Sequence, residues 1–261
     1  MLVQHTLDRL RQMGLHGMAQ ALEAQRTQPD VHGLTFEDRL GLLADQEWTL
    51  RQNRRLTRLL QEAKLRFPTA CLEDVDYHRP RGLDRSVLRS LGGGEWIRAQ
   101  QVVLISGPTG IGKSWIACAL GNAACRQGFS TRYYRVPRLL TDLALAHADG
   151  SYPRFLARLA KTQLLILDDW GLTPLSASDA RELLEVIEDR VQVHATLVTS
   201  QLPLDALHAA IADPTLADAI LDRLVHHAHK LVLKGESMRK VLEGGASKSQ
   251  RQGGEELPRR R

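Results

Sequence analysis

One stretch of eight residues constrains the fold more than any other part of the sequence. Residues 107–114 read Gly-Pro-Thr-Gly-Ile-Gly-Lys-Ser and match the pattern GxxxxGK[ST]. An apolar run at 102–105 precedes the stretch, and a helix-like apolar segment at 115–120 follows it. Since a strand before the pattern and a helix after it are the context that the pattern requires, the sequence predicts a phosphate-binding loop here.

Each residue type in this loop has a physical reason for being there. Glycines let the backbone wrap a phosphate chain with its N–H groups pointing inward, and the following helix N-terminus adds partial positive charge. Lys113 can reach the β- and γ-phosphates of a nucleotide, and the Ser114 hydroxyl can ligate Mg²⁺. The predicted nucleotide-binding residues are Gly107, Pro108, Thr109, Gly110, Ile111, Gly112, Lys113, Ser114 and Trp115.

A pair of carboxylates gives the second signal. The apolar run 164–167 ends in Asp168 and Asp169. Asp168 is placed to hold Mg²⁺, usually through water, and Asp169 to polarise the attacking water as a general base. Alone, the pattern would also fit a strand that ends in a solvated turn. Its place after the phosphate-binding loop, with one strand-like run between, favours the metal site. Aspartate is shorter than the glutamate more usual at position 169, so we expect slow or partner-dependent hydrolysis.

Two further segments carry polar candidates. The run 196–199 leads into Ser200 and Gln201, so Thr199, Ser200 or Gln201 either orients water against the γ-phosphate or caps the strand. Asp213 and Pro214 then predict a helix start.

Arg223 lies at the edge of the apolar face of that helix. It can act as an arginine finger toward the nucleotide of a neighbouring subunit, or form a surface salt bridge. Arg239 is a weaker candidate for sensing phosphate.

The order of apolar segments predicts the fold class. Five short apolar runs, at 102–105, 131–136, 164–167, 196–199 and 230–233, alternate with helix-like segments. Buried strands separated by helices indicate a parallel α/β sheet covered on both faces.

The remaining segments predict the domain organisation. Residues 1–75 read as a small all-helical N-terminal domain, and 76–242 as the nucleotide-binding domain, of which 76–100 is a connecting stretch. Residues 243–261, rich in Gly, Ser, Gln and Arg, read as a disordered basic tail.

A long helix in the N-terminal part could run to about Arg66. It carries Arg51, Arg54, Arg55 and Arg58 at spacings that share one face. This stripe is either a solvated face or a set of phosphate contacts. The net charge of +5 and pI of about 9.3 permit a polyanionic partner but do not require one.

Composition excludes several other classes of protein. With 43% hydrophobic and 25% charged residues, the chain is not wholly disordered. The three cysteines show no CxxC spacing, so neither a disulfide framework nor a zinc site is expected. No apolar run approaches the ~20 residues that span a bilayer, and charged residues within the first 30 argue against a signal peptide, so a cytoplasmic protein without a membrane partner is expected.

Together these segments resemble the IstB-like helper ATPases of bacterial insertion sequences, which are relatives of the DnaC helicase loader. The resemblance covers about residues 1 to 240. It rests on residues 107–114, 164–171, 197–203, 213–224 and 235–239, with 72–77 fitting the family's segment near the adenine.

The resemblance implies an AAA+ P-loop NTPase core after a helical N-terminal domain. It also implies that ATP and Mg²⁺ drive assembly of a ring or helical homo-oligomer on duplex DNA, which recruits a partner transposase and helps to choose the target site for integration. By the same carry-over, Asp168 and Asp169 form Walker B, Gln201 or Ser200 is the first sensor, and Arg223 is the arginine finger. Gln201 departs from the Asn that is more usual at the sensor position.

Two other functions remain open from the sequence. A helicase loader would share the fold and differ in its partner, and residues 213–224 and 235–239 favour the transposition helper over it. A small-molecule kinase would need a substrate-binding insertion or lid, which the sequence does not offer. The two adjacent aspartates also favour hydrolysis over phosphoryl transfer to a small molecule.

Overall fold

The computed structural model of the chain describes residues 2–203, 206–225 and 228–238. It divides into two compact units, Met1–Leu59 and Leu60–Arg261. The division falls inside a helix and earlier than the boundary at residue 75 expected from the sequence. The basic tail expected at 243–261 lies outside the described residues.

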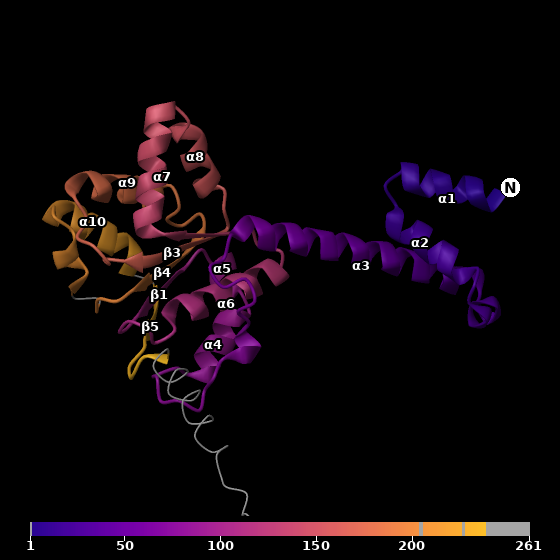
Figure 1. Ribbon diagram of the computed structural model, residues 1–261, viewed down its shortest axis with the longest axis horizontal. Coiled ribbons are helices and arrows are strands. Elements are labelled where there is room, and N and C mark those ends of the chain that lie inside the picture. Colours follow the sequence, from indigo (N-terminus) through magenta and orange to yellow (C-terminus); the bar gives the residue numbers. More distant parts are fainter. Residues whose placement is uncertain (1, 204–205, 226–227, 239–261) are drawn as a thin grey trace, which may run out of the picture. The chain divides into compact units, whose positions relative to one another are not determined.

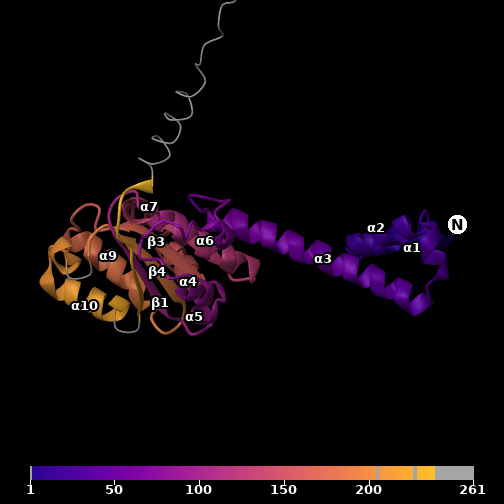
Figure 2. The same cartoon turned by 90° about the horizontal axis from the view of Figure 1, so that it is seen from below.

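The first unit is helical, as the sequence predicts. It contains α1 (Leu2–Gln12), α2 (His16–Gln25), the 3₁₀ turn η1 (Pro29–Gly33) and the first part of α3 (Phe36–Ala63). Within it, α1 packs on α2, and α2 lies beside α3 around Glu47 (Figure 2). The contact is close because Gly17 of α2 has no side chain: a Cβ there would lie 2.6 Å from the Cα of Glu47.

Glu47 of α3 also caps the start of α2. Its buried carboxylate accepts the N–H groups of Gly17 at 2.6 Å and Met18 at 3.2 Å, and it pairs with Arg51 at 2.6 Å. The hydrogen bond from Arg51 and these N–H groups lower the pKa of Glu47. A helix N-terminus favours such a charge because its first N–H groups have no partner within the helix.

The second unit contains a five-stranded parallel sheet in the order β2-β3-β4-β1-β5 (Figure 1). Its strands are β1 (Val102–Ser106), β2 (Thr131–Arg135), β3 (Leu164–Trp170), β4 (Ala195–Ser200) and β5 (Ala228–Val232). The sheet predicted from the five apolar runs is confirmed. Because all strands are parallel, their carboxyl ends meet at one edge, where Ser106 of β1 pairs with Ser200 of β4.

Helices cover both faces of the sheet. On one face α6 contacts β1 to β4; on the other, α7 contacts β2 and β3, α10 contacts β1, and α7 and α10 pack on α9. The bounds are α6 (Lys113–Arg126), α7 (Val136–Asp149), α8 (Tyr152–Ala160), α9 (Ala177–Glu188) and α10 (Pro214–Val225). Strand residues Leu104, Leu165 and Val198 pack into the second of these layers, which is why the runs are apolar at nearly every position.

The connecting stretch expected at 76–100 is wrong in part, because it holds two helices, α4 (Arg85–Gly92) and α5 (Glu95–Arg98). Asp84 caps α4 by accepting the N–H of Ser86 at 2.7 Å, and Leu88 and Leu91 are buried. These two helices are short and have few apolar positions, and the glycines at 92–94 favoured the interpretation of the stretch as a connection. Two further 3₁₀ turns are η2 (Leu72–Asp74), which precedes this stretch, and η4 (His208–Ala210), which follows β4.

Helix α3 ends at Ala63, three positions before the end expected near Arg66. Lys64 has a positive φ of 50°, which stops the helix.

In the part of the chain that the structure covers, no helix has the length and apolar character to span a bilayer.

Candidate functional site

The loop predicted to bind phosphate connects β1 to α6 at the carboxyl edge of the sheet. Gly110 and Gly112 have φ of 82° and 103°, a backbone conformation that favours glycine. A Cβ on Gly110 would lie 2.1 Å from the Oγ of Ser237, and Met238 donates its N–H to the Gly110 carbonyl at 2.9 Å. The segment after β5 therefore packs closely on the loop, which leaves no room for a side chain at this glycine.

Lys113 is the first residue of α6 and points back into the loop. Its ammonium group donates to the carbonyl oxygens of Gly107 at 2.6 Å and Pro108 at 2.9 Å. Burial lowers the pKa of Lys113, while Asp168 and Asp169 oppose the shift. The cation is thus held inside the curve of the loop by neutral acceptors that anionic oxygens could replace.

Arg81 donates a hydrogen bond to the backbone of the loop. Its guanidinium is buried and donates to the carbonyls of Ile111 at 3.2 Å and Asp76 at 2.7 Å. Burial lowers the pKa of Arg81. Sequence reasoning did not find this residue, because it lies in the stretch read as a connection.

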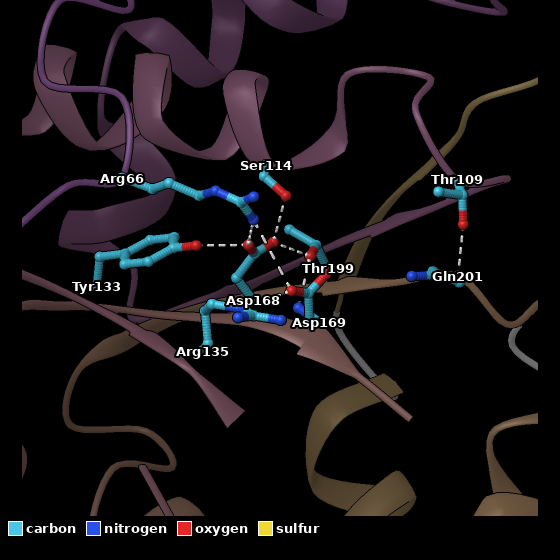
Figure 3. Close-up of polar contacts among 9 residues, drawn as sticks. All are labelled: Arg66, Thr109, Ser114, Tyr133, Arg135, Asp168, Asp169, Thr199 and Gln201. Carbon is cyan, nitrogen blue, oxygen red and sulfur yellow. Dashed lines mark hydrogen bonds and ion pairs between the residues drawn. The ribbon is translucent and has the colours of Figure 1, made fainter. Parts of the chain in front are cut away.

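Asp168 lies at the carboxyl end of β3 and is fully buried. Its carboxylate accepts hydrogen bonds from Ser114 at 2.9 Å and Tyr133 at 2.5 Å, and a further one from Thr199 (Figure 3). Burial and the Asp168 carboxylate raise the pKa of Tyr133, so the phenol stays a donor. The two predicted magnesium ligands, Ser114 and Asp168, are therefore in direct contact.

Asp169 is set apart from its neighbour by backbone geometry. It has a φ of 61°, and the pairing of β3 with β4 is irregular between Leu167 and Trp170. Its N–H donates to the Thr199 hydroxyl at 3.2 Å, and its carboxylate accepts from Arg135 Nε at 2.8 Å. This hydrogen bond raises the pKa of Arg135.

A second arginine reaches the same carboxylates. Arg66 Nη1 lies 3.8 Å from Asp168 Oδ2 and 3.9 Å from Asp169 Oδ2. In Figure 3, Arg66 and Arg135 approach the acidic pair from different sides. Sequence reasoning placed neither arginine at this site. Arg135 could have been found, because it ends a predicted strand that neighbours the acidic one, whereas Arg66 has no comparable local signal.

The structure separates the three polar candidates after β4. Gln201 faces the loop and accepts a hydrogen bond from Thr109 at 2.6 Å. Ser200 is buried and donates to the Trp170 carbonyl at 2.9 Å, so it belongs to the strand end. The Thr199 hydroxyl donates a hydrogen bond to Asp168 and accepts one from the N–H of Asp169. Gln201 is the residue placed to meet a ligand in the loop, and its sensor role stays a prediction.

Arg223 is not brought to this site. It pairs with Glu188 at 2.5 Å and donates to the Ala219 carbonyl at 2.8 Å. It lines a different cavity of about 460 Å³, together with Val102 of β1 and Thr196 of β4. The surface salt bridge expected as its alternative role is present, and a contact with a neighbouring subunit stays a prediction. Arg239 lies outside the described residues.

A cavity of about 530 Å³ opens at the loop, within the size range of ligand pockets. The predicted nucleotide-binding residues that line it are Thr109, Gly110, Gly112, Lys113, Ser114 and Trp115. Asp169, Gln201, Arg66 and Arg135 line it as well. Glycine backbone, an ammonium group and a hydroxyl beside a carboxylate are the donors that a nucleoside triphosphate with Mg²⁺ requires.

A metal ion at this site would need ligands from the nucleotide as well as from the protein. Among the described residues, no three His, Cys, Asp or Glu side chains gather as a possible metal site. Mg²⁺ is usually held by one or two protein ligands and by substrate phosphates, so a Ser–Asp pair beside a phosphate-binding loop fits that ion.

Comparison with solved structures supports the fold. The chain is similar to the DnaC helicase loader, with a TM-score of 0.56 and 19% identity over 65% of this chain and 99% of that one. It is also similar to DnaI, with a TM-score of 0.56 and 20% identity over 68% of this chain and 94% of that one. At these identities the likeness shows the fold alone, a P-loop NTPase core.

Comparison of sequences reaches further. A protein of Sinorhizobium fredii, named as an insertion sequence ATP-binding protein, is 51% identical over 92% of this chain and 98% of its own length. A protein of Pseudomonas fluorescens, named as the ATP-binding protein of insertion sequence IS1162, is 53% identical over 78% of this chain and 88% of its own. Residues 8–245 match the family described as IstB-like ATP binding protein, so the chain belongs to that family, as the resemblance implied.

Proposed function

We propose that this protein binds ATP and Mg²⁺ in the 530 Å³ cavity, hydrolyses ATP slowly, and assembles on duplex DNA to assist a partner transposase in target selection and integration. The observation that carries the nucleotide part is the hydrogen bond of 2.9 Å between Ser114 and Asp168. It joins a residue of the phosphate-binding loop to the acidic strand end, which is the pairing that a triphosphate with its metal needs.

The chain's own residues have distinct parts in binding. Lys113 would exchange the carbonyls of Gly107 and Pro108 for phosphate oxygens, which are stronger acceptors for an ammonium group. Ser114 and Asp168 would hold Mg²⁺, which supplies positive charge against the phosphates. Tyr133 and Thr199 donate to Asp168 and so fix the orientation of its carboxylate.

Hydrolysis needs a free base beside the γ-phosphate position. Asp169 would take a proton from the attacking water, and Gln201 would orient that water. The hydrogen bond from Arg135 occupies the Asp169 carboxylate, so the base is held back until this contact opens. This supports slow turnover that DNA or a partner protein accelerates.

A basic surface on the nucleotide-binding unit supports the DNA part. Arg154, Arg158 and Lys161 recur at helical spacing along α8 and just beyond it, and all three are exposed. With Arg132 of the edge strand β2 they line a shallow cavity of about 380 Å³. Cations spaced along one surface suit the phosphates of a nucleic acid backbone.

The arginine stripe of α3 is a second candidate for phosphate contacts. Arg51, Arg54, Arg55 and Arg58 are exposed on the helix, as the sequence predicts. Arg51 is engaged with Glu47 at 2.6 Å, and Arg55 and Arg58 also have partners within the chain. The α8 surface is therefore the better starting point for mapping DNA contacts.

The proposals for the partner protein and for the homo-oligomer are supported by the family to which the chain belongs. The relatives above are named for insertion sequences, which supports a transposase as the partner and the cytoplasm as the place of action. Arg223 would contribute to the nucleotide site of the next subunit in a ring or helical homo-oligomer. The fold shared with DnaC keeps a helicase loader as the alternative, and capture of the replicative helicase rather than a transposase would favour it.

The decisive experiment is electron microscopy and light scattering of the protein with duplex DNA, with and without a non-hydrolysable ATP analogue. We expect large regular assemblies only when both DNA and nucleotide are present. Lys113→Ala is the matched control and should remain unassembled. A protein that stays monomeric with DNA and nucleotide would overturn the proposal of assembly.

A further inference from the structure

Arg66 is held by the nucleotide-binding unit at the point where α3 ends. Ala63 and Leu65 are buried, and Leu65 fills the space left by Gly121 of α6, where a Cβ would lie 2.9 Å from the leucine methyl group. The Pro68 carbonyl accepts a hydrogen bond from Asn122 at 3.2 Å. The backbone around Arg66 is thus anchored on α6, the helix that also presents Lys113 and Ser114.

The side chain of Arg66 lies over the acidic pair. Its two contacts, 3.8 Å to Asp168 and 3.9 Å to Asp169, are longer than hydrogen bonds, whereas Arg135 makes a directed bond of 2.8 Å to Asp169. The Arg66 side chain is 37% exposed and lines the 530 Å³ cavity. The guanidinium also lies over the Phe67 ring, 5.4 Å from its centroid, and interacts with the Tyr133 hydroxyl. None of these contacts is a short hydrogen bond to a carboxylate, so a better anionic partner in the cavity can draw the guanidinium away from the aspartates.

The charges around Arg66 indicate that this anionic partner is a phosphate. Arg66 lies beside two adjacent carboxylates, and one of them, Asp168, accepts a hydrogen bond from Ser114 (Figure 3). A guanidinium binds a phosphate through two parallel N–H bonds, which is stronger than two long contacts to separate carboxylates. A terminal phosphate beside Asp169 would offer that pairing, and a diphosphate, which lacks this group, would not.

We propose that Arg66 is a ligand of the γ-phosphate supplied by the same chain, so that it discriminates a nucleoside triphosphate from a diphosphate. With the triphosphate bound, Arg66 leaves the carboxylates; with the diphosphate, it stays on them. The inference rests on the proposed function, since it assumes that the cavity binds ATP.

The test is calorimetric titration of the full chain with Mg²⁺ and either ADP or a non-hydrolysable ATP analogue. For Arg66→Gln we expect affinity for the ATP analogue to fall about tenfold or more, since a charged hydrogen-bonding partner is lost, while affinity for ADP stays within about twofold. Arg66→Lys should recover part of the lost affinity, because lysine keeps the positive charge but lacks the paired N–H groups of the guanidinium. Arg138→Gln is the matched control: Arg138 lies on α7, outside the cavity, and pairs with Asp142 at 3.1 Å, and its loss should change neither affinity.

The outcomes separate the two proposals. Equal loss for both nucleotides would give Arg66 a purely structural role, and no loss for either would give it none; each overturns the inference while the nucleotide site stands. A wild-type protein that binds neither nucleotide would overturn the proposed function together with the inference. Should Arg66→Gln fail to fold, the ratio of the two affinities in Arg66→Lys, compared with wild type, decides the matter in the same way.

Discussion

The hydroxyl of Ser114 donates a hydrogen bond of 2.9 Å to the carboxylate of Asp168, a residue 54 positions further along the chain. Ser114 lies in the first turn of α6 and Asp168 near the carboxyl end of β3, and the parallel sheet brings the two segments to the same edge. The protein itself therefore assembles the pair of groups that we propose as magnesium ligands.

Replacing Lys113 by alanine should abolish nucleotide binding. The change removes both a positive charge and the group that lies inside the loop, where it contacts Gly107 and Pro108. Calorimetry with ATP analogue and ADP would measure the loss. Lys161→Ala, an exposed lysine after α8, is the control and should bind nucleotide normally. Unchanged affinity in Lys113→Ala would count against the whole assignment of the site.

Asp169→Asn should bind ATP but hydrolyse it about 100-fold more slowly or worse, because an amide of the same shape cannot accept the proton of water. Binding is measured by calorimetry, and turnover by release of phosphate. Full turnover in this variant would remove Asp169 as the general base.

Arg135→Gln should raise the basal rate of ATP hydrolysis, on the order of tenfold, because the Asp169 carboxylate loses its 2.8 Å partner and becomes a better base. Stimulation by DNA should shrink in the same proportion. Phosphate release measured with and without DNA tests this. A lower basal rate, with nucleotide affinity intact, would mean that Arg135 assists hydrolysis directly and that the restraint we infer is absent.

The stability of the protein should fall between about pH 9 and 11 in part through Cys118. Burial raises the pKa of this fully buried thiol from 9.0 to about 11. Since the unfolded chain loses the proton first, the stabilisation is present below pH 9 and is lost as pH rises toward 11. Denaturant unfolding across this range should show a shallower fall for Cys118→Ala, by up to about 2 kcal/mol. Identical pH profiles for variant and wild type would exclude this contribution.

Reversing Arg154 and Arg158 together to glutamate should weaken duplex DNA binding and reduce its dependence on salt. Each lost phosphate contact lowers the slope of log K against log salt by about 0.9, so a double variant should lose about 2 from the slope. Fluorescence anisotropy in the presence of ATP analogue gives both quantities. Arg89→Glu together with Arg98→Glu, two exposed arginines on α4 and α5, changes the net charge by the same amount and serves as the control. A slope equal to wild type would move the DNA interface elsewhere.

Much of the fold and part of the site could be read from short segments. The phosphate-binding loop, the five strands and the paired aspartates each depend on residue types within a few neighbouring positions, and the parallel sheet of the structure confirms the strands. Backbone conformation and hydrophobic burial act over the same short range, so local sequence carries their signal. The cap of α4 at Asp84 is local too, but glycines around 92–94 concealed it.

Other features depend on the order of strands in the sheet, which no single segment reveals. The pairing of β2 with β3 sets Arg135 beside Asp168 in the register and brings Tyr133 to the same carboxylate, and the anchoring on α6 brings in Arg66. Gln201 rather than Ser200 faces the loop because Ser200, the last residue of β4, is buried and donates to the Trp170 carbonyl. The sequence by itself therefore determined which groups can hold a phosphate and its metal. Only the tertiary structure decided which distant cations restrain them, because electrostatic contacts depend on distance in space and not on separation along the chain.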